Sequence, residues 1–187
     1  GGVTSAVAAA PTENGPLARV FSVLCDNKQR TQWDVLCERC ETVRTLDEHN
    51  DITRLVFKKP TTVDGEVALS DFALLRSWRA NDDRSRFLIA NHSIRAPQIV
   101  PEVEGCVRGA VGSAGWVLEA VAAEENDDGT PCDEVVVELT YLVTLAAAGI
   151  QALGASAVDV LAGRSKVICH NIAGIAKVVG ATLRGEP

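Results

Sequence analysis

The stretch VDVLAGRSKVICHNIAGIAKVVGATL, residues 158–183, decides how the chain is expected to fold. Its apolar residues recur every three or four positions, which places them along one side of an α-helix. The stripe consists of Val158, Leu161, Ser165, Ile168, Ile172, Ile175, Val179 and Leu183. Small residues such as Ala162, Gly163, Ala173 and Gly174 make the helix thin. The pattern predicts one long amphipathic helix that covers the preceding elements without filling all the space beneath it.

The segments before this helix have the alternating pattern of β-strands. Apolar and polar residues alternate within short runs, and turns rich in Gly, Pro, Asn and Asp separate these runs. Strands are predicted at residues 51–58, 71–78, 87–94, 106–111, 115–121 and 134–143. Because the connections are short, neighbouring strands are expected to be antiparallel.

Two further pieces precede the strands. Leu17, Val20, Phe21 and Leu24 recur at helical spacing and predict a short helix, and residues 30–40 are expected to form a second short helical or looped piece. The predicted fold class is α+β, with a curved antiparallel sheet wrapped on the long C-terminal helix. Residues 1–15 are expected to be a flexible leader or linker, and residues 16–187 a single domain.

Composition narrows the class of function. The chain has 18 Lys and Arg against 25 Asp and Glu, a formal net charge of −7. A negative chain without a basic cluster does not favour nucleic-acid binding. No uninterrupted apolar stretch is long enough to cross a membrane. The six cysteines lack the spacing of a disulfide framework, which predicts reduced thiols in an intracellular compartment, cytoplasmic or organellar. The absence of Met predicts that the chain is a processed piece of a longer product, whose removed part could carry another domain.

Residues with catalytic or metal-binding potential do not form a recognisable site. Cys37 and Cys40 have the spacing of half a zinc site, but neither a second pair nor a histidine at ligand spacing accompanies them. His49, His92 and His170 are not part of a nucleophile–base arrangement. We therefore predict no catalytic residues, no metal, no cofactor and no enzymatic activity in these residues.

Several short segments resemble one known family in order. Residues 30–34 (RTQWD) and 71–76 (DFALLR) resemble the R-x-x-W-D and DFV-x-x-R segments of START (steroidogenic acute regulatory-related lipid transfer) domains. The remaining matches are Ser93-Ile94 with Pro97, Val107-Arg108-Gly109, Gly115-Trp116-Val117-Leu118 and Leu139-Thr140-Tyr141. The resemblance runs from about Leu17 to Leu183. Within the family, the segments around Trp33 and Asp71 and residues 171–174 look nearest to the START domains of acyl-CoA thioesterases.

The resemblance implies a helix-grip fold with a tunnel for one lipid between the sheet and the last helix. It implies a lipid or fatty-acyl ligand, lipid binding or transfer, transient contact with a membrane surface and no catalysis. One departure is large. Family members have a helix and three strands before the position of Leu17, where this chain has sixteen mostly small residues. Those strands were removed, lost, or supplied by a protein partner that completes the sheet.

Arg76 is the most informative single residue. Alternation places it on the same face as Leu74 and Trp78, which is expected to be the inner face. A buried guanidinium needs partners, so Arg76 either contacts a polar group of the ligand or pairs with a protein carboxylate such as Glu119 or Glu138. In sterol-binding relatives an acidic residue on the preceding strand faces this arginine. Counting without gaps places Phe57 there, which predicts a lost ion pair and disfavours a sterol.

The predicted ligand-lining set follows from the inner-face positions of strands and helix. It comprises Arg76, Phe57, Leu74, Trp78, Asn91, Tyr141, Ile168, Ile172 and Ile175. The predicted function is binding of one apolar ligand in an internal cavity. Two alternatives stay open: a degenerate START-like structural subunit of a larger assembly, and an accessory domain of an acyl-CoA thioesterase whose catalytic domain lies upstream.

Overall fold

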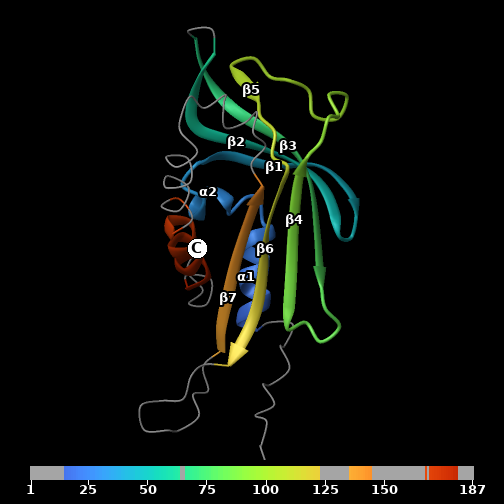
Figure 1. The fold of residues 1–187 in the computed structure, drawn as a ribbon, viewed down its shortest axis with the longest axis vertical. Helices are drawn as coiled ribbons and strands as arrows, with labels where there is room; N and C mark the ends of the chain where they lie inside the picture. Colours follow the sequence, from blue (N-terminus) through green and yellow to red (C-terminus); the bar gives the residue numbers. More distant parts are fainter. Residues whose placement is uncertain (1–14, 64–65, 123–134, 145–166, 168, 181–187) are drawn as a thin grey trace, which may run out of the picture.

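The computed structural model describes residues 15–63, 66–122, 135–144, 167 and 169–180. The elements in chain order are α1 (Pro16–Cys25), α2 (Arg30–Trp33), β1 (Cys37–Asp47), β2 (Asn50–Val63), β3 (Glu66–Ala80), β4 (Arg86–Ser93), β5 (Cys106–Arg108), β6 (Ser113–Ala122) and β7 (Val135–Thr144). Residues 169–180 form a C-terminal helical segment, which lies near the label C in Figure 1. Of the predicted leader, only Gly15 is among the described residues. Of the predicted helix at residues 158–183, only Val167 and residues 169–180 are described.

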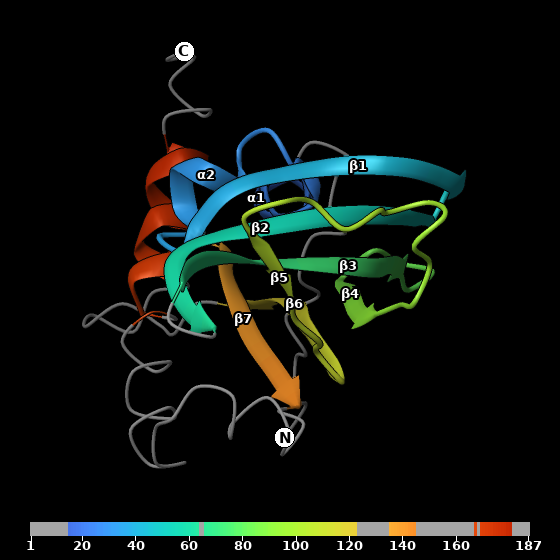
Figure 2. The ribbon, with the colours of Figure 1, turned by 90° about the horizontal axis from the view of Figure 1, so that it is seen from above.

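The strands form a seven-stranded sheet with the order β1-β2-β3-β4-β6-β7, in which every neighbouring pair is antiparallel. The short strand β5 lies off this path and pairs parallel with β3, which corrects the expectation of purely antiparallel pairing. Figures 1 and 2 show that the sheet bends strongly: β1 and β2 run across the direction of β6 and β7, and α1 lies inside the curve. The predicted α+β helix-grip arrangement is confirmed.

Most predicted elements are present, with one miss. Strand β1 begins at Cys37, within the piece that was expected to be helical or looped. Its residues after Cys37 are mostly exposed and five of them are charged, so the strand lacks the alternation that would reveal it. Strands β2 and β3 also run further into the predicted turn at residues 60–65, because a register shift between Phe57 and Thr61 accommodates Pro60.

The main core lies on the inner face of β4 and β6. Helix α1 begins with Pro16 at its first turn, where a missing N–H costs nothing, and turns its apolar side to the sheet. The last helical segment packs against the same cluster. The buried members are Leu17, Val20, Val23, Leu24, Trp33, Phe87, Ile89, Trp116, Leu118, Ile175, Val178 and Val179.

Two smaller clusters cover the other half of the sheet. The second cluster lies on the inner face of β1–β3 and consists of Cys37, Leu55 and Leu74, with Cys40, Phe57 and Phe72 partly buried beside them. A third cluster lies on the outer face, where Ile52, Ala73 and Val100 pack with Leu75, Ile94 and Ile99. Strand β2 is therefore covered on both faces, and residues 51–56 are all buried.

The C-terminal helical segment is held against the α2–β1 junction. Asn171 accepts a hydrogen bond from the backbone N–H of Val35 at 3.1 Å, and its amide donates to Asp34 at 3.3 Å. A Cβ atom added to Gly174 would lie 2.7 Å from the carbonyl oxygen of Trp33, so the close approach requires glycine. These contacts give Trp33 and Asp34 structural roles. Across the described ranges, no helix combines the length and apolar character needed to cross a membrane.

Candidate functional site

A buried ion pair occupies the inner face of the sheet between the main core and the second cluster. Asp51 on β2 and Arg76 on β3 are directly opposite in the strand register. Nε of Arg76 donates to Oδ1 of Asp51 at 3.0 Å, and Nη2 donates to Oδ2 at 2.6 Å. Such a bidentate pair fixes the guanidinium plane as well as its position. The two side chains are only 7% and 5% exposed, so the pair has little contact with solvent.

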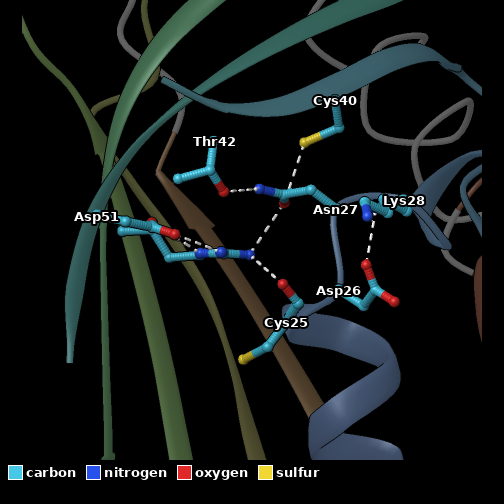
Figure 3. Close-up of polar contacts among 8 residues, drawn as sticks. Cys25, Asp26, Asn27, Lys28, Cys40, Thr42 and Asp51 are labelled. Carbon is cyan, nitrogen blue, oxygen red and sulfur yellow. Dashed lines mark hydrogen bonds and ion pairs between the residues drawn. The ribbon is translucent and has the colours of Figure 1, made fainter. Parts of the chain in front are cut away.

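The other side of the guanidinium holds the end of α1. Nη1 of Arg76 donates to the backbone carbonyl of Cys25 at 2.8 Å and to Oδ1 of Asn27 at 3.0 Å. The amide of Asn27 in turn donates to Thr42 on β1 at 2.8 Å, and the thiol of Cys40 donates to Oδ1 of Asn27 at 3.2 Å. Figure 3 shows the three contacts of Asn27, with Thr42, with Cys40 and with the guanidinium. The turn after α1 is thus fastened to β1 and β3 by one polar cluster.

The ion pair corrects the sequence-based expectation for Arg76. The residue opposite Arg76 is Asp51, and Phe57 lies opposite Ser70 instead. Glu119 and Glu138, which were expected as possible partners of Arg76, are also wrong. Glu119 forms an ion pair with Arg86 at 2.9 Å, and Glu138 lies opposite Glu119 in the β6–β7 register. Counting from matched family segments without gaps missed the true hairpin register. The argument against a sterol, which rested on a lost ion pair, therefore falls.

Three predicted site residues lie beside Arg76. Asn91 on β4 is its cross-strand neighbour, so Asp51, Arg76 and Asn91 form a polar row across three strands. The guanidinium carbon of Arg76 lies 5.4 Å from the ring centroid of Trp78, which is a cation–π distance. Leu74 is buried in the second cluster two residues along the same strand face.

The other predicted residues are spread more widely. Phe57 packs against Phe72 in the second cluster, with ring centroids 5.2 Å apart and the rings tilted by 57°. Tyr141 lies 4.5 Å from the ring of Trp116 and Ile175 is buried in the main core, so both belong to the packing under α1. Ile168 lies outside the described residues.

Ile172 differs from its predicted position. Its side chain is 38% exposed, whereas Asn171, Ile175, Val178 and Val179 are buried. The buried side of the helical segment therefore runs through Asn171 and not through Ile172, because the hydrogen bonds of Asn171 to the α2–β1 junction set the rotation of the helix.

The residues missed by sequence reasoning are Asp51 and Asn27. Asp51 lies on the same strand face as Thr53, Leu55 and Phe57. An acidic residue on this inner face was the sequence signal that could have revealed it, because a buried charge needs a partner. Asn27 gave no signal, because an asparagine after a helix ordinarily ends it. Its role exists only because the fold brings β1 and β3 beside that turn.

Burial makes the cysteines near this cluster poor nucleophiles. Loss of solvent raises the pKa of Cys25 and of Cys37 to about 12, and raises the pKa of Cys40 in the same direction. A thiolate is the reactive form, so these thiols stay protonated and inert at neutral pH. Within the described parts of the chain, no group of three or more His, Cys, Asp and Glu is placed to hold a metal ion.

A second buried polar cluster lies on the outer face. Asp71 receives hydrogen bonds from Arg54 at 3.0 Å and from Arg108 at 2.9 and 3.0 Å. Arg108 also donates to the carbonyls of Val100 and Pro101 at 3.2 and 3.1 Å. This cluster fastens the segment that leads to β5 over the third cluster, which gives the DFALLR segment a structural role.

Taken together, these elements define an α+β helix-grip domain. The inner face of its concave sheet carries the polar row of Asp51, Arg76 and Asn91, with Leu74 on one side of Arg76 and Trp78 on the other. Comparison with known proteins places it more closely. The START domain family model matches residues 6–143, so the chain belongs to the START domain family, whose members are in general non-catalytic lipid-binding domains.

Solved structures share this fold. Human StAR-related lipid transfer protein 5 superposes with a TM-score of 0.63 at 15% identity, over 89% of this chain and 71% of that chain. The human StarD13 (DLC2) lipid transfer and protein localization domain gives 0.57 at 19% identity, over 90% and 71%. A STAR-related lipid transfer protein fragment from Xanthomonas axonopodis gives 0.50 at 18% identity, over 90% and 79%. No curated protein matches the chain.

Proposed function

We propose that the chain binds one elongated lipid or fatty-acyl molecule on the inner face of its sheet. The apolar part of the ligand lies along the second cluster, and its polar group lies at the row formed by Asp51, Arg76 and Asn91. The proposal rests on one observation above the others: the rings of Phe57 and Phe72 are only partly buried on the inner face that also carries the buried ion pair, four residues along β3 from Arg76 and six along β2 from Asp51.

The chemistry of this face suits such a ligand. Each CH₂ group moved from water to an apolar surface contributes about 0.8 kcal/mol, so a long chain needs few polar contacts for affinity. Four of the five N–H groups of Arg76 are used within the protein, and the oxygens of Asp51 retain acceptor capacity. The polar row therefore orients a hydroxyl or carbonyl group rather than neutralising a full charge.

The relatives support the same direction. Membership of the START family and the names of two similar solved proteins, which include lipid transfer, agree with a lipid ligand. Transfer between membranes would add transient contact with a membrane surface. The five cysteines in the described part of the chain are free, which agrees with the predicted reducing, intracellular setting. Membrane contact and an intracellular setting are both part of the proposal.

A structural role is the second candidate. The side chains of α1 and of the C-terminal helical segment fill the inner face of β4 and β6. If the β1–β3 half were equally filled by the chain itself, the domain would serve as a non-binding subunit of an assembly. An accessory role beside a thioesterase domain has no supporting contact in the described residues.

Native mass spectrometry of the purified chain, with solvent extraction and identification of bound lipids, tests the proposal directly. A chain with one co-purifying lipid, or one that takes up a fluorescent fatty-acyl or sterol probe with one-to-one stoichiometry, supports it. A ligand-free chain that binds neither probe contradicts it and favours the structural role.

Two substitutions locate the site. Phe57→Glu introduces a charge on the proposed apolar surface and should weaken probe binding at least tenfold, and Phe57→Ala should weaken it less. Leu88→Glu is the matched control, because Leu88 is 45% exposed on β4, outside the buried clusters. Equal binding by Phe57→Glu and Leu88→Glu, with both variants folded by circular dichroism, would place the ligand elsewhere.

A further inference from the structure

The ring of Phe72 packs against the backbone of Gly109. Arg108, the last residue of β5, lies opposite Asp71 in the parallel β3–β5 register, so Gly109 is the next neighbour of Phe72. A Cβ atom added to Gly109 would overlap Cε1 of the ring and lie 2.8 Å from Cζ, whereas ordinary contacts of a Cβ atom begin at 3.4 Å. An aromatic ring covers a neighbouring glycine in this way because the glycine has no side chain of its own.

The backbone on both sides of this contact is fixed. The N–H of Gly109 donates to the carbonyl of Asp71 at 2.8 Å. The side chain of Arg108 donates to the carboxylate of Asp71 at 2.9 and 3.0 Å, and to the carbonyl of Val100 at 3.2 Å. Moving β5 away from β3 would break these bonds in a half-buried site, which is costly. A larger residue at position 109 would therefore displace the ring of Phe72 and not the strands.

The displaced ring has one direction open to it. On its β2 side, Phe72 lies opposite Leu55, which is buried, and its ring centroid is 5.2 Å from that of Phe57. The rings of Phe57 and Phe72 are only partly buried. Pushed away from Gly109, the ring of Phe72 would move across Phe57 and away from the sheet, on the inner face where the ligand is proposed to lie.

We propose that Gly109 sets the length of apolar chain that the inner face accepts, through the position of the Phe72 ring. The role assigned to Gly109 rests on the proposed function. Phe72 is four residues from Arg76 on β3, which is about 13 Å along a strand. A ligand whose polar group lies at Arg76 reaches Phe72 only when its chain is long. Gly109 is thus a positioning residue that acts on long-chain lipids with an uncharged oxygen group and not on short ones.

Competition of two alcohols against a fluorescent fatty-acyl probe, bound to the intact chain, tests this role. The two competitors are 1-octanol, whose chain is too short to reach Phe72, and 1-hexadecanol. We expect Gly109→Ala to lower the ratio of hexadecanol affinity to octanol affinity about tenfold, which is the effect of losing roughly two CH₂ contacts. The affinity for octanol should stay the same, because the row at Arg76 is not touched.

A double variant separates displacement of the ring from general damage. Leucine has no ring to meet the new Cβ atom, so the ratio in F72L/G109A should equal that in Phe72→Leu alone. A loss that came from a loosened β5 would persist in the double variant. Phe72→Trp places a larger ring over the unchanged Gly109 and should lower the ratio in the same direction, so the test does not depend on one variant.

Gly112→Ala is the matched control. A Cβ atom at Gly112 would come no closer than 3.5 Å to its neighbours, an ordinary contact with the carbonyl oxygen of Thr144, so the ratio should not change. An unchanged ratio in folded Gly109→Ala, a loss that F72L/G109A does not restore, or an equal loss in Gly112→Ala overturns the role of Gly109 and leaves the proposed function standing. A parent chain that binds neither the probe nor the alcohols overturns both.

Discussion

Asp51 and Arg76 face each other across β2 and β3, with both guanidinium nitrogens of one edge bonded to both carboxylate oxygens. The opposite edge of the same guanidinium holds the carbonyl of Cys25 and the side chain of Asn27. One arginine therefore joins two strands and the end of α1.

Removing Arg76 alone should be costly. In Arg76→Leu the Asp51 carboxylate stays buried without a counter-ion, and we expect a loss of about 3–5 kcal/mol in the free energy of unfolding. The double variant D51L/R76L should be clearly more stable than Arg76→Leu, because no charge is left buried. Urea unfolding of the three proteins measures both differences.

The control for this comparison is Arg86→Leu. Nε of Arg86 lies 2.9 Å from a carboxylate oxygen of Glu119, a close ion pair, but the two side chains are 58% and 37% exposed. Its loss should change stability by about 1 kcal/mol or less. If Arg86→Leu costs as much as Arg76→Leu, burial is not what makes the inner pair important.

Asp71 should be the most sensitive carboxylate of the outer face. Asp71→Asn leaves the guanidinium groups of Arg54 and Arg108 close together without their shared counter-ion, so we expect a loss of about 3–5 kcal/mol. Arg108→Leu should cost less, since Arg54 and Asp71 would still form a neutral pair. Urea unfolding gives the order, with the exposed Asp82→Asn as the control; the reverse order would contradict the proposed balance of charges.

Gly174→Ala should destabilise the chain although alanine is the better helix former. The new Cβ would lie 2.7 Å from the oxygen and 2.8 Å from the Cα of Trp33, both backbone atoms that do not move aside easily. We expect a loss of about 1–3 kcal/mol, against a propensity gain of about 1 kcal/mol. Lys177→Ala, on the exposed side of the same helical segment, gains propensity without a clash and should not destabilise. A Gly174→Ala protein as stable as the parent would show that the helix is not held against Trp33.

Stability should fall in alkaline solution through the buried thiols. Burial raises the pKa of Cys25 and Cys37 to about 12, whereas thiols in an unfolded chain ionise near pH 8.5. Above that pH the unfolded state binds fewer protons than the folded state, so this contribution to stability is lost as pH rises from about 9 toward about 12. Urea unfolding at a series of pH values should show a shallower decline in Cys37→Ala than in the parent.

Thiol labelling gives an independent check of the same groups. Cys169 is exposed, and Cys37 is fully buried. A thiol reagent at neutral pH should modify Cys169 rapidly and reach Cys25 and Cys37 only after unfolding. Rapid labelling of Cys37 in the folded chain would contradict its burial and the raised pKa that follows from it.

The sequence by itself determined the elements that have a strong local period. The helix at α1 and six of the seven strands follow from apolar spacing, because a residue facing a core must be apolar whichever residue it touches. The order of short motifs indicated the START family, because a motif is read from the residue types and their order without knowledge of their contacts. The remaining strand, β1, escaped because an edge strand turns most of its side chains to solvent and so loses the alternation.

Only the tertiary structure decided the site. Which carboxylate meets Arg76 depends on the register of a long hairpin, and one shift between Phe57 and Thr61 changes every pair beyond it. The role of Asn27 depends on three elements meeting at one turn, and the exposure of Ile172 depends on how Asn171 sets the rotation of the last helix. A one-dimensional pattern records which face of an element is apolar. The contacts between elements far apart in the chain arise only when those faces are packed together.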